Sequence, residues 1–429
     1  MEQRFSLSAN IEEGFSKDTQ YIVTPNVQKS MSSILDSYRS GIHTFTIIGT
    51  YGTGKSSFLL ALESDLTQKK HTHYLLTPEN LSKCKGYEFM NIVGDYAELS
   101  TLIRKKMFIE GEGGSVLDEL KAYYNKLYKS NKFLVIVIDE FGKVLEHAAK
   151  NNPEQELYFM QKLAEFVNVP SRNILLLTTL HQNFSSYARG LKESQVNEWT
   201  KVKGRFKEIA FVEPIEQILS LASSQLYGNE KVIDQDNAKQ LYDLAVNMGY
   251  VSKSFSIDTA YNLYPMDTIS SVAITSAIQR YGQNERSLFT FLAAKGSDSL
   301  SEFVPKDNLT YNLQMVYNYV QYNFYSYLKD ANADSMAWSS ISVSIDRTES
   351  QQWESREEML HAVNVVKAIG LLNLFGPSTF TLNREDLSLY AKYAMGIDDA
   401  MGIIKKLEAY KIVRFAEYKK RLMLFEGTD

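Results

Sequence analysis

The chain has 429 residues, of which 44% are hydrophobic and 23% are charged, so its composition excludes a largely disordered chain. Its net charge of −5 gives the chain as a whole no attraction to nucleic acid or to an anionic membrane, although local patches could still provide it. The single cysteine, Cys84, excludes an intrachain disulfide and a cysteine-based metal site, and it suits a reducing cytosol.

A chain of this length is expected to form two or three domains. The amino terminus lacks the basic segment and the following apolar segment of a signal peptide. No apolar run in the sequence reaches the length of a membrane span. We therefore expect a cytoplasmic protein that has no membrane partner.

The first predicted elements form a strand–helix–strand unit. A Thr-Pro pair at 24–25 predicts an N-cap and the first helical position, and Gly41 can end this helix. An apolar and β-branched strand at 44–48 follows, then a glycine-rich turn and a helix with apolar residues at helical spacing over 55–66. The run HTHYLL at 71–76 predicts the next strand, and a helical region is expected from there to residue 129.

Two further apolar runs predict strands that are buried on both faces. They are KFLVIVID at 132–139 and NILLLTTL at 173–180. Apolar strands that alternate with helices indicate an α/β fold with a parallel sheet covered by helices on both sides. After Pro214 helices dominate, so we expect domain boundaries near Glu213 and near residue 300.

The loop between the first strand and its helix predicts a phosphate-binding site. Residues 49–56, GTYGTGKS, match G-x-x-x-x-G-K-[ST] at every position. Glycines allow backbone N–H groups to surround a β-phosphate at the positive end of the following helix. Lys55 is expected to reach the β- and γ-phosphates, and Ser56 to bind Mg²⁺. The alternative is a glycine turn that only joins the strand to the helix. The predicted nucleotide-binding residues of this segment are Gly49, Thr50, Tyr51, Gly52, Thr53, Gly54, Lys55, Ser56 and Ser57.

Asp139 and Glu140 stand at the end of a buried strand and predict catalytic acids. Asp139 is placed to hold the magnesium shell, as the equivalent acid does in other P-loop enzymes. Glu140 would act as the general base that polarises the attacking water. Adjacent acids at a strand end can also form a solvated turn, but the upstream Lys-Ser loop favours the catalytic interpretation. Six scattered histidines and no H-E-x-x-H pattern indicate no metal other than this Mg²⁺.

With this loop and this acidic pair, residues 20–300 resemble the AAA+ superfamily, particularly its origin-recognition-like and STAND-like ATPases. The resemblance implies a nucleotide-binding domain over 1–212, a helical lid over 213–299 and a homo-oligomer with shared active sites. It also implies ATP rather than GTP, and no guanine-reading Asn-Lys-x-Asp sequence occurs.

The resemblance suggests further site residues. A γ-phosphate sensor is expected in LLLTTLHQNF, where Thr179 and His181 both lie near the required position; a threonine that only caps the strand end is the alternative. Arg205 in GRFKEIAF matches an arginine finger that completes the site of a neighbouring subunit. Arg286 in GQNERSLFTFL matches a lid arginine that touches the nucleotide. For Arg205 the alternative is a solvated basic face formed with Lys201, Lys203 and Lys207.

The region 300–429 predicts a helical linker and a winged-helix-like domain, because three helical patterns precede two short strands. Its third helix has balanced charge, whereas the predicted wing carries three basic residues. Contact with a protein and contact with DNA both stay open. An aromatic-rich helix over 311–328 is expected to be a packing surface or an oligomer contact rather than a base-stacking platform. The basic residues of the wing are Lys419, Lys420 and Arg421.

Four phrases, DEFGK, TLHQNF, GRFKEIAF and GQNERSLFTFL, also resemble large ATP-binding proteins of prokaryotic anti-phage defence. The resulting expectation is an ATP-hydrolysing, oligomerising switch or motor that acts on an effector protein or on DNA in such a setting. One alternative is a nucleotide-gated scaffold with incidental hydrolysis. Another is a winged-helix DNA-binding initiator or transposition-type loader.

Overall fold

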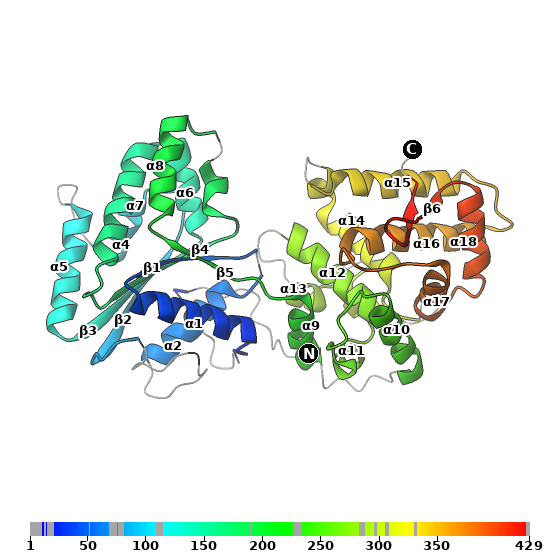
Figure 1. Ribbon diagram of the computed structural model, residues 1–429, viewed down its shortest axis with the longest axis horizontal. Helices are drawn as coiled ribbons and strands as arrows, with labels where there is room; N and C mark the ends of the chain where they lie inside the picture. Colours follow the sequence, from blue (N-terminus) through cyan, green and yellow to red (C-terminus); the bar gives the residue numbers. More distant parts are fainter. Residues whose placement is uncertain are drawn as a thin grey trace. The chain divides into compact units, whose positions relative to one another are not determined.

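The computed structural model describes residues 11–12, 14, 21–50, 52–67, 75, 81–108, 115–188, 190–226, 234–282, 288–295, 298–304, 309–329 and 333–425. The chain divides into two compact units, Met1–Glu213 and Pro214–Asp429 (Figure 1). The predicted strand at 71–76 lies outside the described residues apart from Leu75.

The first unit is built around a five-stranded sheet with the strand order β2-β3-β4-β1-β5. All neighbouring strands in this sheet are parallel. The predicted α/β fold with a parallel sheet is therefore confirmed. The strands are β1 (Thr44–Ile48), β2 (Gly86–Val93), β3 (Lys132–Asp139), β4 (Ile174–Leu180) and β5 (Lys207–Ala210).

Helices cover both faces of this sheet (Figure 1). Side chains alternate along a strand, so in β3 the residues Phe133, Val135 and Val137 join the core beneath α1 and α2. Leu134 and Ile136 join the core on the other face, beneath α4 to α8. The helices are α1 (Pro25–Arg39), α2 (Lys55–Thr67), α4 (Leu99–Lys106), α5 (Val116–Lys129), α6 (Phe141–Lys150), α7 (Pro153–Val167) and α8 (Glu193–Lys203).

Helix α1 begins and ends at the predicted residues. The Thr24 side chain accepts a hydrogen bond from the Val27 N–H, and Pro25 occupies the first helical position, where its missing N–H costs nothing. Gly41 follows the helix with a φ of 90°, a left-handed conformation that glycine adopts without strain.

Strand β2 corrects the prediction of a helical region through Lys129. Among the described strands, β2 (residues 86–93) lies at the edge of the sheet and pairs with β3 along its whole length; α4 and α5 follow it. Most of its residues are only half-buried, with Met90 and Ile92 as the buried exceptions. Glu88 and Asn91 interrupt the apolar pattern, so the sequence lacks the continuous apolar run that identifies the central strands.

The second unit is mainly helical. One hydrophobic core runs through it from Leu219 to Leu424, so residues 214–299 and 300–425 share buried packing. The division of this part at residue 299 stays a prediction. The helices are α9 (Ile215–Leu226), α10 (Gln235–Asn247), α11 (Ile257–Asn262), α12 (Thr268–Tyr281), α13 (Leu288–Ala293), α14 (Leu313–Lys329), α15 (Ser335–Glu349), α16 (Arg356–Phe375), α17 (Arg384–Met395) and α18 (Ala400–Ala409).

Helix α16 corrects the expectation that no segment reaches the length and apolarity of a membrane span. It has 20 residues and a mean hydropathy of 1.3 in its most apolar window, and among the described residues it is the one helix that meets both criteria. It is a core helix, because Val365, Ile369 and Leu372 are fully buried within the second unit. A buried core helix of a globular protein has the same composition as a short membrane span.

The aromatic-rich helix is α14, and its main role is packing. Val316, Val320 and Phe324 are buried in the core of the second unit, whereas Tyr322 is 76% exposed. The chain then ends in α16, α17, α18 and an antiparallel hairpin of β6 (Val413–Ala416) and β7 (Arg421–Leu424). The predicted succession of three helices and two strands is present, and its classification as a winged helix stays a prediction.

Candidate active site

The glycine-rich loop lies at the carboxyl edge of the sheet, between the end of β1 and the start of α2 at Lys55. Gly52 and Gly54 have φ angles of 73° and 84°, which L-amino acids with side chains rarely adopt. The loop therefore needs glycine at both positions. The carboxyl ends of β3 and β4 lie at the same edge, because these strands are parallel neighbours of β1. Tyr51 lies outside the described residues.

Lys55 is buried, with 6% of its surface exposed. Its Nζ donates to the carbonyl oxygens of Gly49 at 2.6 Å and Thr50 at 2.8 Å. Burial lowers the pKa of Lys55 to about 8, and the negative charges of Asp139 and Glu140 oppose this shift. A buried ammonium group within the loop provides a strong donor for an anion that binds there.

Asp139, at the end of β3, forms hydrogen bonds with Ser56, which follows the glycine-rich loop, and with Thr179 of β4. Its carboxylate accepts a 2.6 Å hydrogen bond from Ser56 Oγ and a 2.5 Å hydrogen bond from Thr179 Oγ1. The Ser56 hydroxyl and the Asp139 carboxylate are hard oxygen ligands, close enough for one Mg²⁺ to contact both. The described residues contain no group of three or more His, Cys, Asp and Glu side chains that could hold a metal.

Thr179 links both acids. Its hydroxyl donates to Asp139 and accepts a 2.9 Å hydrogen bond from the Glu140 N–H. Glu140 has a left-handed backbone, with φ 53° and ψ 35°, which costs about 1 kcal/mol for a residue with a side chain. The Thr179 contact helps to hold this conformation. Its single hydroxyl proton is committed to Asp139, so Thr179 has no further hydrogen to offer a γ-phosphate.

His181 follows β4 at the same edge of the sheet and is partly buried. Burial lowers the pKa of His181 to about 3, with smaller contributions from the positive charges of Lys55 and Lys143. The imidazole is therefore neutral at physiological pH and has one N–H donor. Because the proton of Thr179 is already used, this geometry favours His181 for the sensor role, which stays a proposal.

Gly94 packs against the backbone of Asp139 and Glu140, a role that no sequence motif predicts. Its N–H donates a 2.7 Å hydrogen bond to the Asp139 carbonyl oxygen. A Cβ atom at this position would lie 2.4 Å from the Glu140 carbonyl oxygen, closer than packed atoms approach. The sequence feature that could have indicated this role is a glycine directly after β2, the strand that pairs with β3.

Arg205 lies at the opposite edge of the sheet. Its carbonyl oxygen accepts hydrogen bonds from Thr44 Oγ1 at 2.5 Å and Asn168 Nδ2 at 3.0 Å, and Thr44 is the first residue of β1. At ~3.3 Å per residue, the length of β1 separates this edge from the loop by about 16 Å. The Arg205 guanidinium forms a 2.7 Å ion pair with Glu165. Arg205 therefore lies away from the loop of its own subunit.

Two of the three neighbouring lysines pair with acidic side chains. Lys201 forms an ion pair with Glu198 at 2.6 Å, and Lys203 forms one with Glu208 at 3.6 Å. Lys207 donates a 2.5 Å hydrogen bond to Ser37 Oγ. The predicted lid arginine, Arg286, lies outside the described residues.

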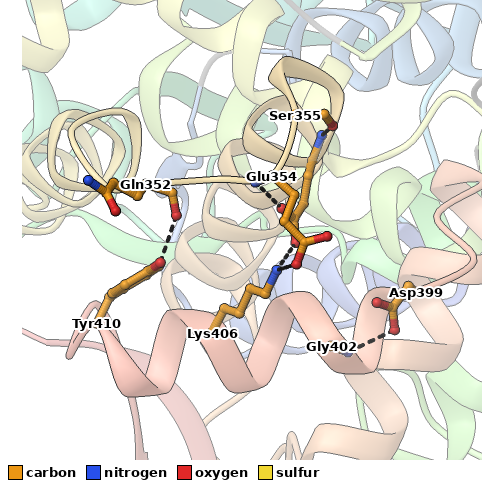
Figure 2. Close-up of polar contacts among 8 residues, drawn as sticks. Gln352, Glu354, Ser355, Asp399, Gly402, Lys406 and Tyr410 are labelled. Atoms are coloured by element: carbon orange, nitrogen blue, oxygen red, sulfur yellow. Dashed lines mark hydrogen bonds and ion pairs between the residues drawn. The ribbon is translucent and has the colours of Figure 1, made fainter.

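Helix α18 contacts the first turn of α16 and the segment that precedes it (Figure 2). Lys406 forms ion pairs with Glu354 at 2.7 Å and Glu358 at 2.5 Å, and these carboxylates raise the pKa of the lysine. Tyr410 donates a 2.7 Å hydrogen bond to the Gln352 carbonyl oxygen. The charge of Lys406 is therefore compensated within the protein, whereas Lys405 on the same helix is exposed.

The predicted wing is only partly exposed. Arg421 donates a 2.8 Å hydrogen bond to the Ser378 carbonyl oxygen, and its guanidinium carbon lies 4.2 Å from the centroid of the Phe380 ring. Lys419 and Lys420 are exposed. Two of the three predicted wing residues thus point basic charge at solvent, while Arg421 packs against the protein.

The parallel sheet, the glycine-rich loop and the contact between Ser56 and Asp139 define the first unit as a P-loop α/β fold, which a helical carboxyl-terminal unit follows. No family model matches the chain, and no curated protein sequence matches it.

Several solved structures resemble the chain weakly. The ORC2 protein of Aeropyrum pernix, in ADPNP–ADP complexes, has 15% identity and a TM-score of 0.38, over 98% of this chain and 93% of that one. Cdc6p of Pyrobaculum aerophilum has 14% identity and a TM-score of 0.38, over 96% and 93%. Drosophila ORC bound to DNA has 10% identity and a TM-score of 0.30, over 91% and 86%. Scores this low carry no argument about the activity or the partners of this chain.

Proposed function

We propose that the chain binds Mg²⁺–ATP at the glycine-rich loop and hydrolyses it as an AAA+-type ATPase whose subunits share active sites. The observation that carries the proposal is the 2.6 Å hydrogen bond between Ser56 and Asp139. This contact supports the proposal because a serine hydroxyl and a carboxylate are oxygen ligands of the kind that Mg²⁺ takes beside phosphate oxygens, and the buried ammonium group of Lys55 belongs to the same loop.

Each residue has a role in the proposed reaction. Lys55 and the backbone N–H groups of the loop bind the β- and γ-phosphates, and Ser56 and Asp139 would hold Mg²⁺. When bound, this ion would neutralise charge on the phosphate oxygens. Glu140 accepts a proton from water as the water oxygen attacks the γ-phosphorus, and ADP leaves with the electrons of the broken P–O bond.

Arg205 is the proposed arginine finger. Its place at the amino edge of the sheet suits a side chain that reaches the γ-phosphate of a neighbouring subunit, because it lies away from its own loop. Hydrolysis would then require assembly into a homo-oligomer. ATP binding and hydrolysis would alternate the protein between assembled and disassembled states. This alternation would act as a switch or motor on an effector protein or on DNA.

The primary test is Mg²⁺-dependent ATP hydrolysis over a series of protein concentrations, with Lys55→Ala, Glu140→Gln and Arg205→Ala as variants. Turnover per subunit should rise with concentration and fall in all three variants. Parallel reactions with double-stranded DNA test whether DNA stimulates the enzyme. Absence of nucleotide binding to the wild-type protein would refute the proposal.

A nucleotide-gated scaffold is a second candidate, and one observation favours it. Glu140 forms an ion pair with Lys143, and Arg205 forms one with Glu165, so both proposed hydrolytic side chains have other partners. In a scaffold, ATP would hold an assembled state and hydrolysis would be slow. Glu140→Gln distinguishes the two: it should stall a hydrolysis-driven machine with ATP bound, but leave the activity of a scaffold intact.

A role in anti-phage defence is proposed only from the resemblance of four sequence segments, DEFGK, TLHQNF, GRFKEIAF and GQNERSLFTFL. Its test is the plating efficiency of phage on cells that express the wild-type chain or Lys55→Ala. Protection that requires Lys55 would support the proposal, and equal plating on both strains would contradict it.

A further inference from the structure

Lys143 stands beside the acidic pair, in the first turn of α6. Its Nζ forms an ion pair with Glu140 Oε2, three residues earlier in the chain. The two side chains are 52% and 36% exposed, so solvent screens the pair and a stronger anion can replace the carboxylate as the partner of Lys143. The proposed general base is therefore held by a contact that is easily exchanged.

Lys143 lies close to the glycine-rich loop, because its partner Glu140 directly follows Asp139, whose carboxylate accepts a 2.6 Å hydrogen bond from Ser56 Oγ. Its charge and the charge of Lys55 both act on the His181 imidazole, although these residues come from α6, from α2 and from the end of β4 respectively. Their basic groups thus gather at the edge of the sheet where the glycine-rich loop lies. The terminal phosphate of a nucleoside triphosphate carries more charge than a single carboxylate, so it competes with Glu140 for Lys143.

Glu140 itself is prepared for such an exchange. Its backbone is fixed by the hydrogen bond from its N–H to Thr179 Oγ1, at 2.9 Å, and by the close approach of Gly94 to its carbonyl oxygen. An exchange of Lys143 for another partner would therefore be a rotation of the Glu140 side chain alone. Loss of the lysine contact would change the direction of the carboxylate without moving the chain.

We propose that Lys143 is a positioning residue that restrains Glu140 until a terminal phosphate draws the lysine away, so that release of the base depends on a nucleoside triphosphate. The inference rests on the proposed ATPase function and adds a means by which the site tells ATP from ADP. ADP has no γ-phosphate, so it leaves the ion pair between Lys143 and Glu140 in place.

The test is a double-mutant cycle that measures affinity for a non-hydrolysable ATP analogue and for ADP, each with Mg²⁺, by calorimetry. The variants are Lys143→Met, Glu140→Gln and the double variant. Lys143→Met should weaken binding of the analogue about tenfold, because a charged donor is lost, and change ADP affinity less than about twofold. Lys143→Arg should restore the preference for the triphosphate.

Glu140→Gln releases Lys143 and should strengthen analogue binding about threefold, a size typical of an exposed ion pair. This gain should disappear when Lys143 is Met. A gain that persists would mean that the Glu140 charge acts on the phosphate alone, and it would overturn the inference. Equal losses for ADP and for the analogue in Lys143→Met would overturn it as well.

Lys121→Met is the matched control, because Lys121 forms an ion pair of the same spacing with Asp118 on α5, at 2.9 Å. It should change neither affinity, and a thermal melt of each variant verifies folding. Failure of the wild-type protein to bind either nucleotide would refute the proposed function itself. Normal binding with an additive cycle would refute only the role of Lys143.

Discussion

Ser56 and Asp139 are 83 positions apart in the sequence, yet Ser56 Oγ donates a 2.6 Å hydrogen bond to Asp139 Oδ2. Ser56 belongs to the first turn of α2, and Asp139 ends β3. The strand order places β4 between β1 and β3, so the contact reaches across a neighbouring strand at the carboxyl edge of the sheet.

Ser56→Ala should weaken Mg²⁺-dependent nucleotide binding about tenfold, because the ion loses a hydroxyl ligand. Binding in the presence of EDTA should change little. Titration of a fluorescent ATP analogue with and without Mg²⁺ measures both quantities. Thr67→Ala is the control on the same helix, because the exposed Thr67 hydroxyl donates to the Glu63 carbonyl oxygen at the far end of α2. It should bind like the wild type; equal losses in the two variants would contradict a metal role specific to Ser56.

Thr179→Val should destabilise the first unit by about 1–3 kcal/mol, because it leaves the Asp139 carboxylate and the Glu140 N–H without their shared hydroxyl. Thr179→Ser keeps the hydroxyl and should retain most of the stability and the turnover. Urea unfolding monitored by circular dichroism gives the free energies. Wild-type stability in Thr179→Val would show that Thr179 does not hold the acids.

Arg205→Ala and Lys55→Ala should each be inactive alone and partly active when mixed. In a mixed oligomer, the intact loop of an Arg205→Ala subunit can meet the intact arginine of a Lys55→Ala subunit. ATP turnover of the mixture, compared with the sum of the separate proteins, measures this recovery. Lack of recovery, in a mixture shown by sedimentation to assemble, would contradict a shared site.

Glu165→Gln tests the ion pair that holds Arg205, without removing the arginine. The Glu165 carboxylate also accepts hydrogen bonds from Gln161 and Lys162, both at 2.9 Å. Solvent screens these surface contacts, so the substitution should leave the free energy of unfolding nearly unchanged. If assembly must free Arg205, the concentration needed for half-maximal turnover should fall about threefold. A higher required concentration would mean that Glu165 positions the arginine for its role instead.

Glu156 predicts a pH dependence of stability. Its side chain is buried and accepts a 3.3 Å hydrogen bond from the Leu99 N–H. Burial raises the pKa of Glu156 from 4.5 to about 7; the Leu99 N–H opposes this shift, and the charge of Glu98 adds to it. Between these two values the folded state binds the proton and the unfolded state does not, so this group makes the free energy of unfolding fall as the pH rises.

Glu156→Gln removes this titration and keeps an oxygen acceptor for Leu99. The variant should be more stable than the wild type above pH 7, by about 1–3 kcal/mol, with a difference that shrinks toward pH 4.5. Urea unfolding at several pH values measures this trend. Glu154→Gln, at an exposed position of the same helix, should show no such change, and parallel curves for Glu156→Gln and the wild type would contradict the prediction.

Local patterns in the sequence determined the parts of the fold and of the site that depend on neighbouring residues. The apolar runs of β1, β3 and β4 identified central strands because both of their faces are buried. Residues 49–56 identified the glycine-rich loop, since its conformation requires glycine at 52 and 54. The Thr-Pro pair at 24–25 identified the start of α1. The edge strand β2 escaped detection, because one half-buried face leaves polar residues within its pattern.

Only the tertiary structure decided how distant side chains meet. The bond from Ser56 to Asp139, the link from Thr179 to both acids, and the place of Arg205 at the far edge of the sheet all follow from the order of the strands. Local propensity does not encode that order, because it depends on which long-range packing buries the most apolar surface. The ion pairs of Glu140 and Arg205 likewise depend on side-chain rotamers, which the local sequence does not specify.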